Sequence, residues 1–348
     1  MSNLKEELTT LALDSGAVRA RVTTRERLDG PPSANPTSVL PSARSVVSYA
    51  VYLGRDFIPD YFGKVTRMVF KRVMFESYQL VGTIGRELVG YLEERGFRAF
   101  SPSPNGVYLQ NSTLSHLLPD FSHRYAALAS GLGSHGWSGN VLVPGCWSTV
   151  YLGSVLTDAE LEPDEPLDEE LCGKCKLCTL VCPNRFFSAR ESQTVTLGGR
   201  EYTCSKKGNH IRCAISCGSL AGLSHDGKWS TWALGTARLP EDDDTLPEIW
   251  ARELANPDNE YIIGHLRPKK PEPWRGPGVL ARSFEDTQPT CNNCILLCSG
   301  PKEWREKLVK LLHSSGRIVL QDGEEVAVDA APESGSLLQE LKEQLVRS

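Results

Sequence analysis

The chain has 348 residues, enough for two domains or for one domain with a cofactor module. Its composition is that of a soluble globular protein, with 40% hydrophobic residues, 23% charged residues and a net charge of −5. This balance gives no global signature of nucleic-acid binding and leaves only the option of a local basic face. No apolar run approaches the roughly 18 residues of a membrane span.

The N-terminus and the cysteine content together indicate the compartment. Charged residues stand at Lys5, Glu6 and Glu7, where a secretory signal would need an apolar core. We therefore expect a cytoplasmic protein whose 11 cysteines are reduced and available to metal.

The N-terminal part alternates between helical and strand patterns. Leucines predict an amphipathic helix over 2–14, and β-branched and aromatic residues predict a buried strand over 45–53. A long helical pattern covers about 64–95, and 97–100 is the next candidate strand. This order favours an open sheet in an α/β domain.

A glycine-rich loop follows a short predicted helix at 123–129. It has four glycines within 131–139, so its backbone can approach a ligand closely. The spacing differs from the G-x-G-x-x-G that opens a helix after a strand, and a Rossmann fingerprint is not supported. Strand patterns at 141–143 and 150–152 suggest a hairpin across Pro144-Gly145.

An acidic linker over 160–170 leads into cysteines spaced C-x2-C-x2-C-x3-C-P. This is the bacterial ferredoxin spacing, in which three thiolates hold one [4Fe–4S] cube and the fourth reaches another cluster. Zinc sites usually show two C-x2-C pairs further apart, so a zinc knuckle is the weaker alternative. The four residues are Cys172, Cys175, Cys178 and Cys182.

A second motif, C-x2-C-x3-C, lies near the C-terminus at Cys291, Cys294 and Cys298. In two-cluster arrangements the motifs exchange their last thiolates. Cys298 would then complete the first cube, and Cys182 would join Cys291 and Cys294 in a second cube.

The second cube still lacks one ligand. Cys204, Cys213 and Cys217 are the candidates, and the last two lie one helical turn apart. The cysteines left over, Cys146 among them, are expected to be buried small hydrophobes.

The motifs are separated by a long insertion, 183–290, with a hairpin expected at 194–203 around Gly198-Gly199. A helix near 302–313, a strand at 317–320 and a polar helix at 336–346 follow. Since a stand-alone ferredoxin needs no large preceding domain, we expect an electron acceptor there, either a substrate or another cofactor.

Several motifs resemble the epoxyqueuosine reductase and reductive dehalogenase superfamily. They are the helix at 124–129 entering the glycine loop, Leu152-Gly153-Ser154 with Leu161-Glu162-Pro163, Arg212-Cys213-Ala214-Ile215-Ser216 and the closing C-x2-C-x3-C. The third motif favours Cys213 as the missing ligand. The match is good over roughly 110–300 and weak before it.

The resemblance implies a fold and a cofactor set. The fold is an α/β (α+β) cobalamin-binding domain, expected at 1–165, joined to a bacterial-ferredoxin-like domain with two [4Fe–4S] clusters at 166–301, and a C-terminal extension at 302–348. It also implies a cobalamin between the glycine-rich loop and the first cluster. The residues expected around it are His123, Arg124, Gly131, Gly133, Ser138 and Asn140.

The chain departs from this family at the proton donor. Epoxyqueuosine reductases carry an Asp about seven residues before the helix arginine, and that register falls at Leu117. His116, Asp120 and His123 are possible replacements, and we expect the donor at Asp120 or His116. Asp120 could instead cap the following helix.

The leading hypothesis is a corrinoid-dependent oxidoreductase. It would take electrons from an external ferredoxin or flavodoxin, pass them through both clusters to cobalamin, and remove oxygen or halide from a small organic substrate or modified nucleoside. The acidic charge, and a C-terminus without the helical repeat of many tRNA-acting members, make tRNA a less favoured partner. The alternative is an electron-transfer or reductive-activator protein that binds no substrate and reduces a partner's cofactor.

Overall fold

The computed structural model describes residues 2–103, 118–217, 221–233, 238–255, 284 and 291–347. Up to residue 160 its helices and strands are α1 (Ser2–Asp14), β1 (Arg19–Thr24), β2 (Ser45–Tyr52), α2 (Ile58–Phe62), α3 (Met68–Glu93), β3 (Ala99–Phe100), α4 (His123–Ala129), β4 (Ser134–His135), β5 (Val141–Leu142) and β6 (Val150–Thr157). Later come η4 (Leu177–Thr179), β7 (Phe187–Leu197), β8 (Arg200–Lys207), α5 (His210–Cys217), α6 (Leu246–Ala255), α8 (Asn293–Leu297), α9 (Lys302–Ser314), β9 (Arg317–Gln321), β10 (Glu324–Val328) and α10 (Glu333–Val346).

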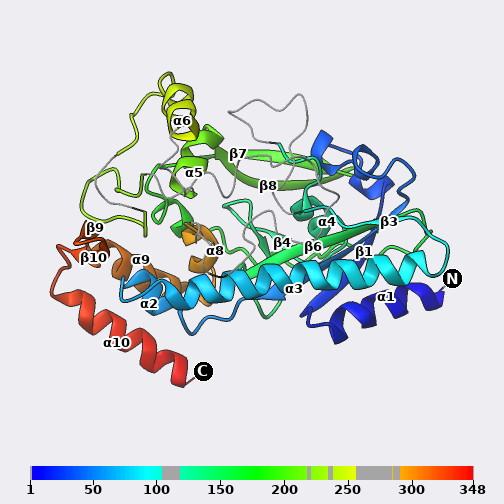
Figure 1. The fold of residues 1–348 in the computed structure, drawn as a ribbon, viewed down its shortest axis with the longest axis horizontal. Coiled ribbons are helices and arrows are strands. Elements are labelled where there is room, and N and C mark those ends of the chain that lie inside the picture. The colour runs from blue at the N-terminus through cyan, green and yellow to red at the C-terminus, as the bar shows by residue number, and fades with distance from the viewer. Residues whose placement is uncertain are drawn as a thin grey trace.

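A four-stranded sheet organises the first part of the chain, with the strand order β1-β2-β6-β3 and antiparallel neighbours throughout. The long helix α3 connects β2 to β3, and β6 lies between these two strands, as in a split βαβ unit. The mixed α/β character predicted from the sequence is confirmed. Figure 1 shows α3 running along the sheet with α1 beside it.

Strand β2 is buried on both faces, which explains its nearly continuous apolar sequence. Val47 and Tyr49 belong to the apolar cluster that contains residues of α1 and α3, whereas Val46 and Ala50 belong to the cluster that contains α4. Tyr49 lies opposite Gly153, where an added Cβ would come within 2.2 Å of the tyrosine ring. The glycine therefore makes room for the ring inside the sheet.

The hairpin predicted across Pro144-Gly145 is wrong. Strand β5 pairs with β4, and β6 pairs with β2 and β3. A single bridge between Val143 and Trp147 closes the turn itself. Pairing along all eight residues of β2, with both faces buried, outweighs what a two-residue hairpin partner offers.

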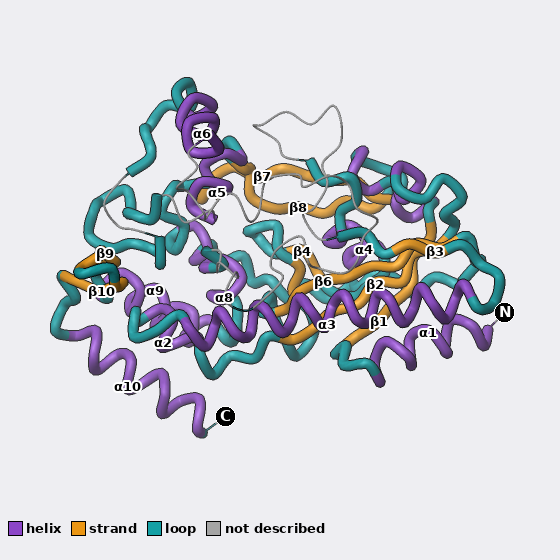
Figure 2. Tube along the Cα trace, in the orientation of Figure 1, coloured by secondary structure: helices purple, strands orange, loops and turns teal. Residues whose placement is uncertain are grey.

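The long hairpin β7–β8 confirms the one predicted at 194–203 (Figure 2). Gly198 and Gly199 both have positive φ, 54° and 81°, as a two-residue turn of type I′ requires. The turn docks on the N-terminal part of the chain, where the Gly198 amide donates to the Asp29 carbonyl over 2.8 Å.

The C-terminal elements confirm both predicted helices and the strand after residue 316. The strand β10 was not predicted, because its two glutamates interrupt the apolar pattern. One buried apolar cluster runs from Leu8 through Leu296 to Trp304 and Leu341, so it spans all three predicted domain segments. The division into domains stays a prediction.

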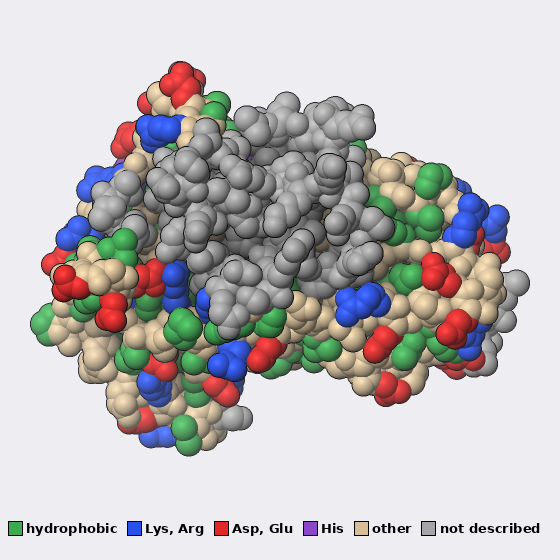
Figure 3. Space-filling view, viewed as in Figure 1, with side chains coloured by type: hydrophobic (Ala, Val, Ile, Leu, Met, Phe, Trp, Pro, Cys, Tyr) green, Lys and Arg blue, Asp and Glu red, His purple; other side chains and the backbone are tan. Residues whose placement is uncertain are grey.

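Within the described residues, every helix is too short or too polar to cross a bilayer. Acidic and basic side chains are interspersed over the described surface in the view of Figure 3. This agrees with a composition that carries no global nucleic-acid signature.

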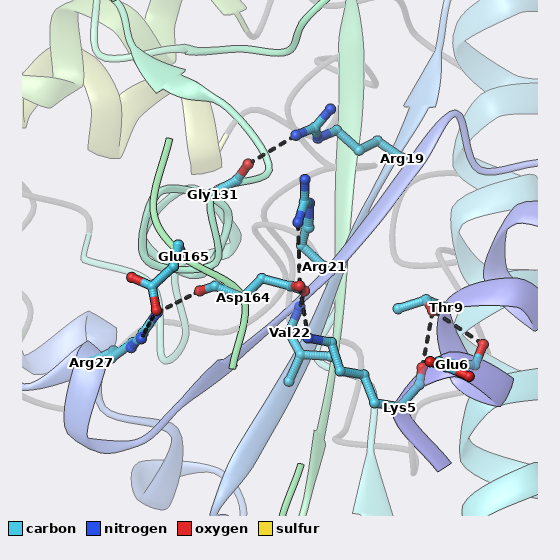
Figure 4. A network of polar contacts seen from close by, with 10 residues as sticks. All are labelled: Lys5, Glu6, Thr9, Arg19, Arg21, Val22, Arg27, Gly131, Asp164 and Glu165. Atoms are coloured by element: carbon cyan, nitrogen blue, oxygen red, sulfur yellow. Dashed lines mark hydrogen bonds and ion pairs between the residues drawn. The ribbon is translucent and has the colours of Figure 1, made fainter. Parts of the chain in front are cut away.

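The acidic linker is fastened to β1 through Asp164 (Figure 4). Its carboxylate accepts the Val22 amide over 2.8 Å and pairs with Lys5 at 2.7 Å and Arg21 at 3.2 Å. Burial opposes ionisation, but these hydrogen bonds and charges outweigh it and lower the pKa of Asp164. The neighbouring Glu165 pairs with Arg27 but is 85% exposed.

Replacing Asp164 by alanine should lower the free energy of unfolding by about 2 kcal/mol at pH 7, since it removes a charged acceptor from partly buried donors. Because the folded pKa is lowered, this stabilisation exists above the unfolded pKa of about 3.9 and is lost as the pH falls below it. Urea denaturation at pH 7 and at about pH 3, below the unfolded pKa, measures both effects. Glu165→Ala is the matched control and should change stability by less than about 0.5 kcal/mol; equal losses in the two variants would contradict the role of Asp164.

Candidate metal centre

The two cysteine motifs fold into the same local structure. Both motifs contain a C-x2-C-x3-C segment, which begins at Cys175 in the first and at Cys291 in the second. The residue after this first cysteine has a left-handed backbone in both, with φ of 61° at Lys176 and 44° at Asn292. A helical turn follows in both, η4 and α8, and carries the second cysteine of the segment. A left-handed side chain costs of order 1–3 kcal/mol and persists only where its surroundings enforce it. The shared shape is therefore imposed by the packing around the cysteines.

The thiols lie in two adjoining groups. The first group joins the three leading cysteines of the first run to one from the second motif, which lies more than 100 positions away: Cys172, Cys175, Cys178 and Cys298. The second group joins the last cysteine of the first run to two from the second motif and one from α5: Cys182, Cys291, Cys294 and Cys213. The charge of Cys294 also affects the pKa of Cys178, so the two groups lie next to each other.

Burial makes several of these thiols hard to ionise. It raises the pKa of Cys182 to about 12 and that of Cys298 to about 11. Peptide N–H groups nevertheless point at sulfur, from Trp137 to Cys172 Sγ over 3.3 Å and from Phe186 to Cys182 Sγ over 3.4 Å. Neighbouring buried cysteines can all ionise only beside a compensating cation, which bound iron would provide.

Among the described side chains, no three His, Cys, Asp or Glu residues are positioned to hold a single metal ion. That geometry is the one required by a lone ion. In a [4Fe–4S] cube each thiolate binds a different iron.

Two cysteines of α5 compete for the last place in the second group. The sulfur atoms of Cys213 and Cys217 lie 3.8 Å apart. The charge of Cys213 affects the pKa of Cys182 and of Cys291. The charge of Cys217 instead affects the pKa of three tyrosines, Tyr61, Tyr78 and Tyr151. The positions favour Cys213 as the fourth member. Of the cysteines outside both groups, Cys204 is buried and Cys146 is half-buried.

The glycine-rich loop lies against both thiol groups. On one side the Trp137 amide reaches Cys172, and on the other the Asn140 side chain faces Cys294, where burial raises the thiol pKa and Asn140 opposes that shift. Ser138 is also buried, and its hydroxyl accepts a hydrogen bond from the backbone N–H of Asn140 over 3.4 Å.

Two of the predicted cofactor-binding glycines are occupied by backbone packing. A Cβ on Gly131 would come within 2.1 Å of the Glu165 carbonyl oxygen, and one on Gly133 within 2.3 Å of the Leu142 carbonyl oxygen. These glycines join the loop to the linker and to β5. Their contact with a cofactor stays a prediction.

Three basic side chains gather beside the loop. Burial, Lys207 and Arg124 lower the pKa of His135 to about 3, and burial together with Arg124 lowers that of Lys207. A Cβ on Gly139 would lie 2.8 Å from the Lys207 Nζ, so this glycine leaves space for the ammonium group. Within the described ranges neither Arg124 nor Lys207 has a carboxylate at ion-pair distance.

The predicted proton donors are placed unequally. His116 lies outside the described residues. Asp120 is half-buried, its carboxylate accepts the Phe121 amide over 2.8 Å, and burial raises its pKa. It does not cap α4, because Ser122 fills that place and accepts the Tyr125 amide.

His123 is buried against β6, and its Nδ1 lies 3.0 Å from the Ser154 hydroxyl. Burial lowers its pKa to about 4, so the ring is neutral at pH 7. A neutral imidazole is a poor acid, so the structure does not support His123 as the proton donor near neutral pH.

One charged side chain at the site, Arg305 of α9, was not predicted. Its guanidinium Nη1 lies 3.5 Å from Cys175 Sγ. The signal available in the sequence was an arginine on the apolar face of an amphipathic helix. Arg212, which precedes Cys213 in its motif, pairs with Asp243 at 2.6 Å.

Comparison with known proteins gives partial matches. We found no family model that matches the chain. The epoxyqueuosine reductase of Bacillus anthracis is 33% identical over 64 residues, which is 18% of this chain and 17% of that protein. The epoxyqueuosine reductase of Staphylococcus aureus is 40% identical over 62 residues, 18% of this chain and 16% of that protein. These matches confirm the resemblance to epoxyqueuosine reductases over a short segment of the chain.

The matched segments span about a sixth of the length of these relatives. Their names describe reductases, in agreement with the predicted oxidoreductase class.

Solved structures give weaker likenesses. One is a reductive dehalogenase whose structure suggests a mechanism for B12-dependent dehalogenation, with 15% identity, coverage of 95% of this chain and 42% of that one, and a TM-score of 0.47. Another is an epoxyqueuosine reductase with an epoxyqueuosine-modified tRNA stem loop, with 18% identity, coverage of 90% and 82%, and a TM-score of 0.41. TM-scores of this size do not establish a common fold.

The buried His123 predicts an acid-sensitive fold. Since its pKa is about 4 in the folded chain and about 6.5 in the unfolded chain, the unfolded state binds the proton first as the pH falls. The free energy of unfolding should therefore decline between pH 6.5 and pH 4, by about 3 kcal/mol at the lower limit. His123→Asn should remove most of this decline in denaturation at pH 7 and pH 4.5, whereas the exposed His225→Asn should leave it intact. Parallel pH profiles for wild type and His123→Asn would disprove the assignment.

Proposed function

We propose that this chain is an iron–sulfur oxidoreductase of the epoxyqueuosine reductase type, with two [4Fe–4S] clusters and a cobalamin. The observation that carries the proposal is the exchange between the two cysteine motifs. Cys298 joins the first group of thiols and Cys182 joins the second. A zinc knuckle would close within one motif.

The two thiol groups suit cubes in number and in surroundings. Each has four cysteines, and in both groups backbone N–H groups approach sulfur, as they do where thiolates carry negative charge. The chain would use the four cysteines of the first group for one cube and the four of the second group for the other. When loaded, the clusters supply single electrons and the cobalamin supplies a cobalt centre able to remove oxygen or halide.

The residues near the glycine-rich loop suit a large polar ligand. Among the described residues, the buried His135 Nδ1 of this loop has no hydrogen-bond partner, and neither has the His123 Nε2 of the preceding helix α4. Buried polar atoms are normally paired, and the amide side chains of a corrin could pair these. Arg124 and Lys207 would add positive charge to the same place.

The proton needed for removal of oxygen or halide has a candidate source in Asp120. Its pKa is raised by burial, which keeps a carboxyl group protonated closer to neutral pH. The substrate would be a small organic molecule or a modified nucleoside, and the electron donor a ferredoxin or flavodoxin.

Anaerobic reconstitution followed by iron, sulfide and cobalt analysis tests the cofactors. The proposal expects about eight irons and about one cobalt for each chain. Corrin absorbance that is lost on desalting would remove cobalamin from the proposal. Clusters without cobalt, together with rapid reduction of a partner's cofactor and no turnover, would favour the reductive activator instead.

The exchange of thiolates predicts opposite effects for two cysteine variants. Cys298→Ala should disturb the cube held by the first run, and Cys182→Ala should spare that cube and damage the other. Electron paramagnetic resonance of each reduced variant, with iron content, separates the two clusters. The reverse pattern would overturn the exchange.

The pair on α5 offers a matched test of the eighth ligand. Cys213→Ser should lower the iron content of the second cluster, whereas Cys217→Ser, one turn away, should keep about eight irons. Loss of iron in the Cys217 variant alone would reassign the ligand.

A further inference from the structure

Arg305 reaches the first group of thiols from α9. Its Nη1 lies 3.5 Å from Cys175 Sγ and 3.9 Å from Cys298 Sγ. The side chain is only 5% exposed, and its guanidinium lies 5.4 Å from the ring centre of Trp147. It therefore contacts one sulfur from each cysteine motif.

Apart from the two sulfurs and the Trp147 ring, no described group offsets the positive charge of Arg305. In the part of the chain that the structure describes, no carboxylate lies within ion-pair distance of it, and its Nε has no hydrogen-bond partner. A buried, unpaired guanidinium is costly, because low-dielectric surroundings replace its hydration. Negative charge on the two sulfurs is what would offset this cost.

The same contact acts on the sulfur side. The positively charged Arg305 Nη1 donates toward the Cys298 sulfur over 3.9 Å. The guanidinium thus favours extra negative charge at this sulfur. An electron added to an iron–sulfur cube is delocalised onto its thiolates, and hydrogen bonds to sulfur are among the factors that set its potential.

We propose that Arg305 sets the reduction potential of the first cluster. Its N–H groups donate to the Cys175 and Cys298 sulfurs, and its positive charge stabilises the cube after it takes one electron, which the external donor supplies through the second cluster. Arg305 is a positioning residue for electron transfer, since it acts through the thiolates. The inference rests on the proposed function, because it requires a cube at this group of thiols.

The matched variants are Arg305→Gln, which removes the charge, Arg305→Lys, which keeps the charge but not the planar fork, and Lys310→Gln, which removes an exposed charge from the same helix. Redox titration followed by electron paramagnetic resonance gives the midpoint of each cluster, after iron and sulfide content has been checked. Arg305→Gln should make the midpoint of the first cluster more negative and leave that of the second unchanged. Arg305→Lys should give a smaller shift, and Lys310→Gln none.

A first-cluster midpoint that is the same in wild type, Arg305→Gln and Arg305→Lys would overturn the proposal. So would an equal shift in both clusters, which would point to a general change in charge. If Arg305→Gln loses its iron, Arg305→Lys decides, because an unshifted midpoint there would again count against Arg305. Wild-type protein that binds no cluster would instead refute the proposed function itself.

Discussion

Eight thiols in two adjoining groups impose the main constraint on this chain. Each group draws cysteines from both motifs, so residues more than 100 positions apart must meet at the same place. The glycine-rich loop, the first run and the helix α9 all converge there, through Trp137, Cys172 and Arg305. The other elements can be understood as the framework that holds these segments together.

The framework has two fixed attachments. At the N-terminal end, Asp164 joins the linker to β1, and Gly131 lets the loop pack on the same linker. At the other end, α9 and α10 pack on α2 and share the apolar cluster of the sheet helices. In the sequence, the first group of thiols lies between the linker held by Asp164 and the packed helix α9. These two attachments limit how far its cysteines can move apart.

Local patterns predicted most of the elements, and spacing related the two cysteine motifs to each other but left Cys213 to the family resemblance. The helix α1, the strand β2 and the hairpin at Gly198-Gly199 each have a periodicity or turn chemistry that acts within a few residues. The pairing of β6 could not be predicted in this way, because its partner β2 lies about 100 residues earlier and local signals equally suit a hairpin.

The site shows the same division. Cysteine identity and spacing carry the chemistry of the thiols, so they could be found in the sequence. Arg305 was not found, because its place on the apolar face of an amphipathic helix indicates burial but does not reveal which distant residues it contacts. The roles of Gly131 and Gly133 were also ambiguous, since a glycine serves close backbone packing as readily as ligand approach.

The distribution of thiols also has a consequence for biosynthesis. Neither group is complete until the ribosome has made Cys291, Cys294 and Cys298, which lie near the end of the chain. Until then the four cysteines of the first run are without their partners and open to oxidation. Complete ligation of either cluster would therefore have to wait until residues more than 100 positions after the first run have been made.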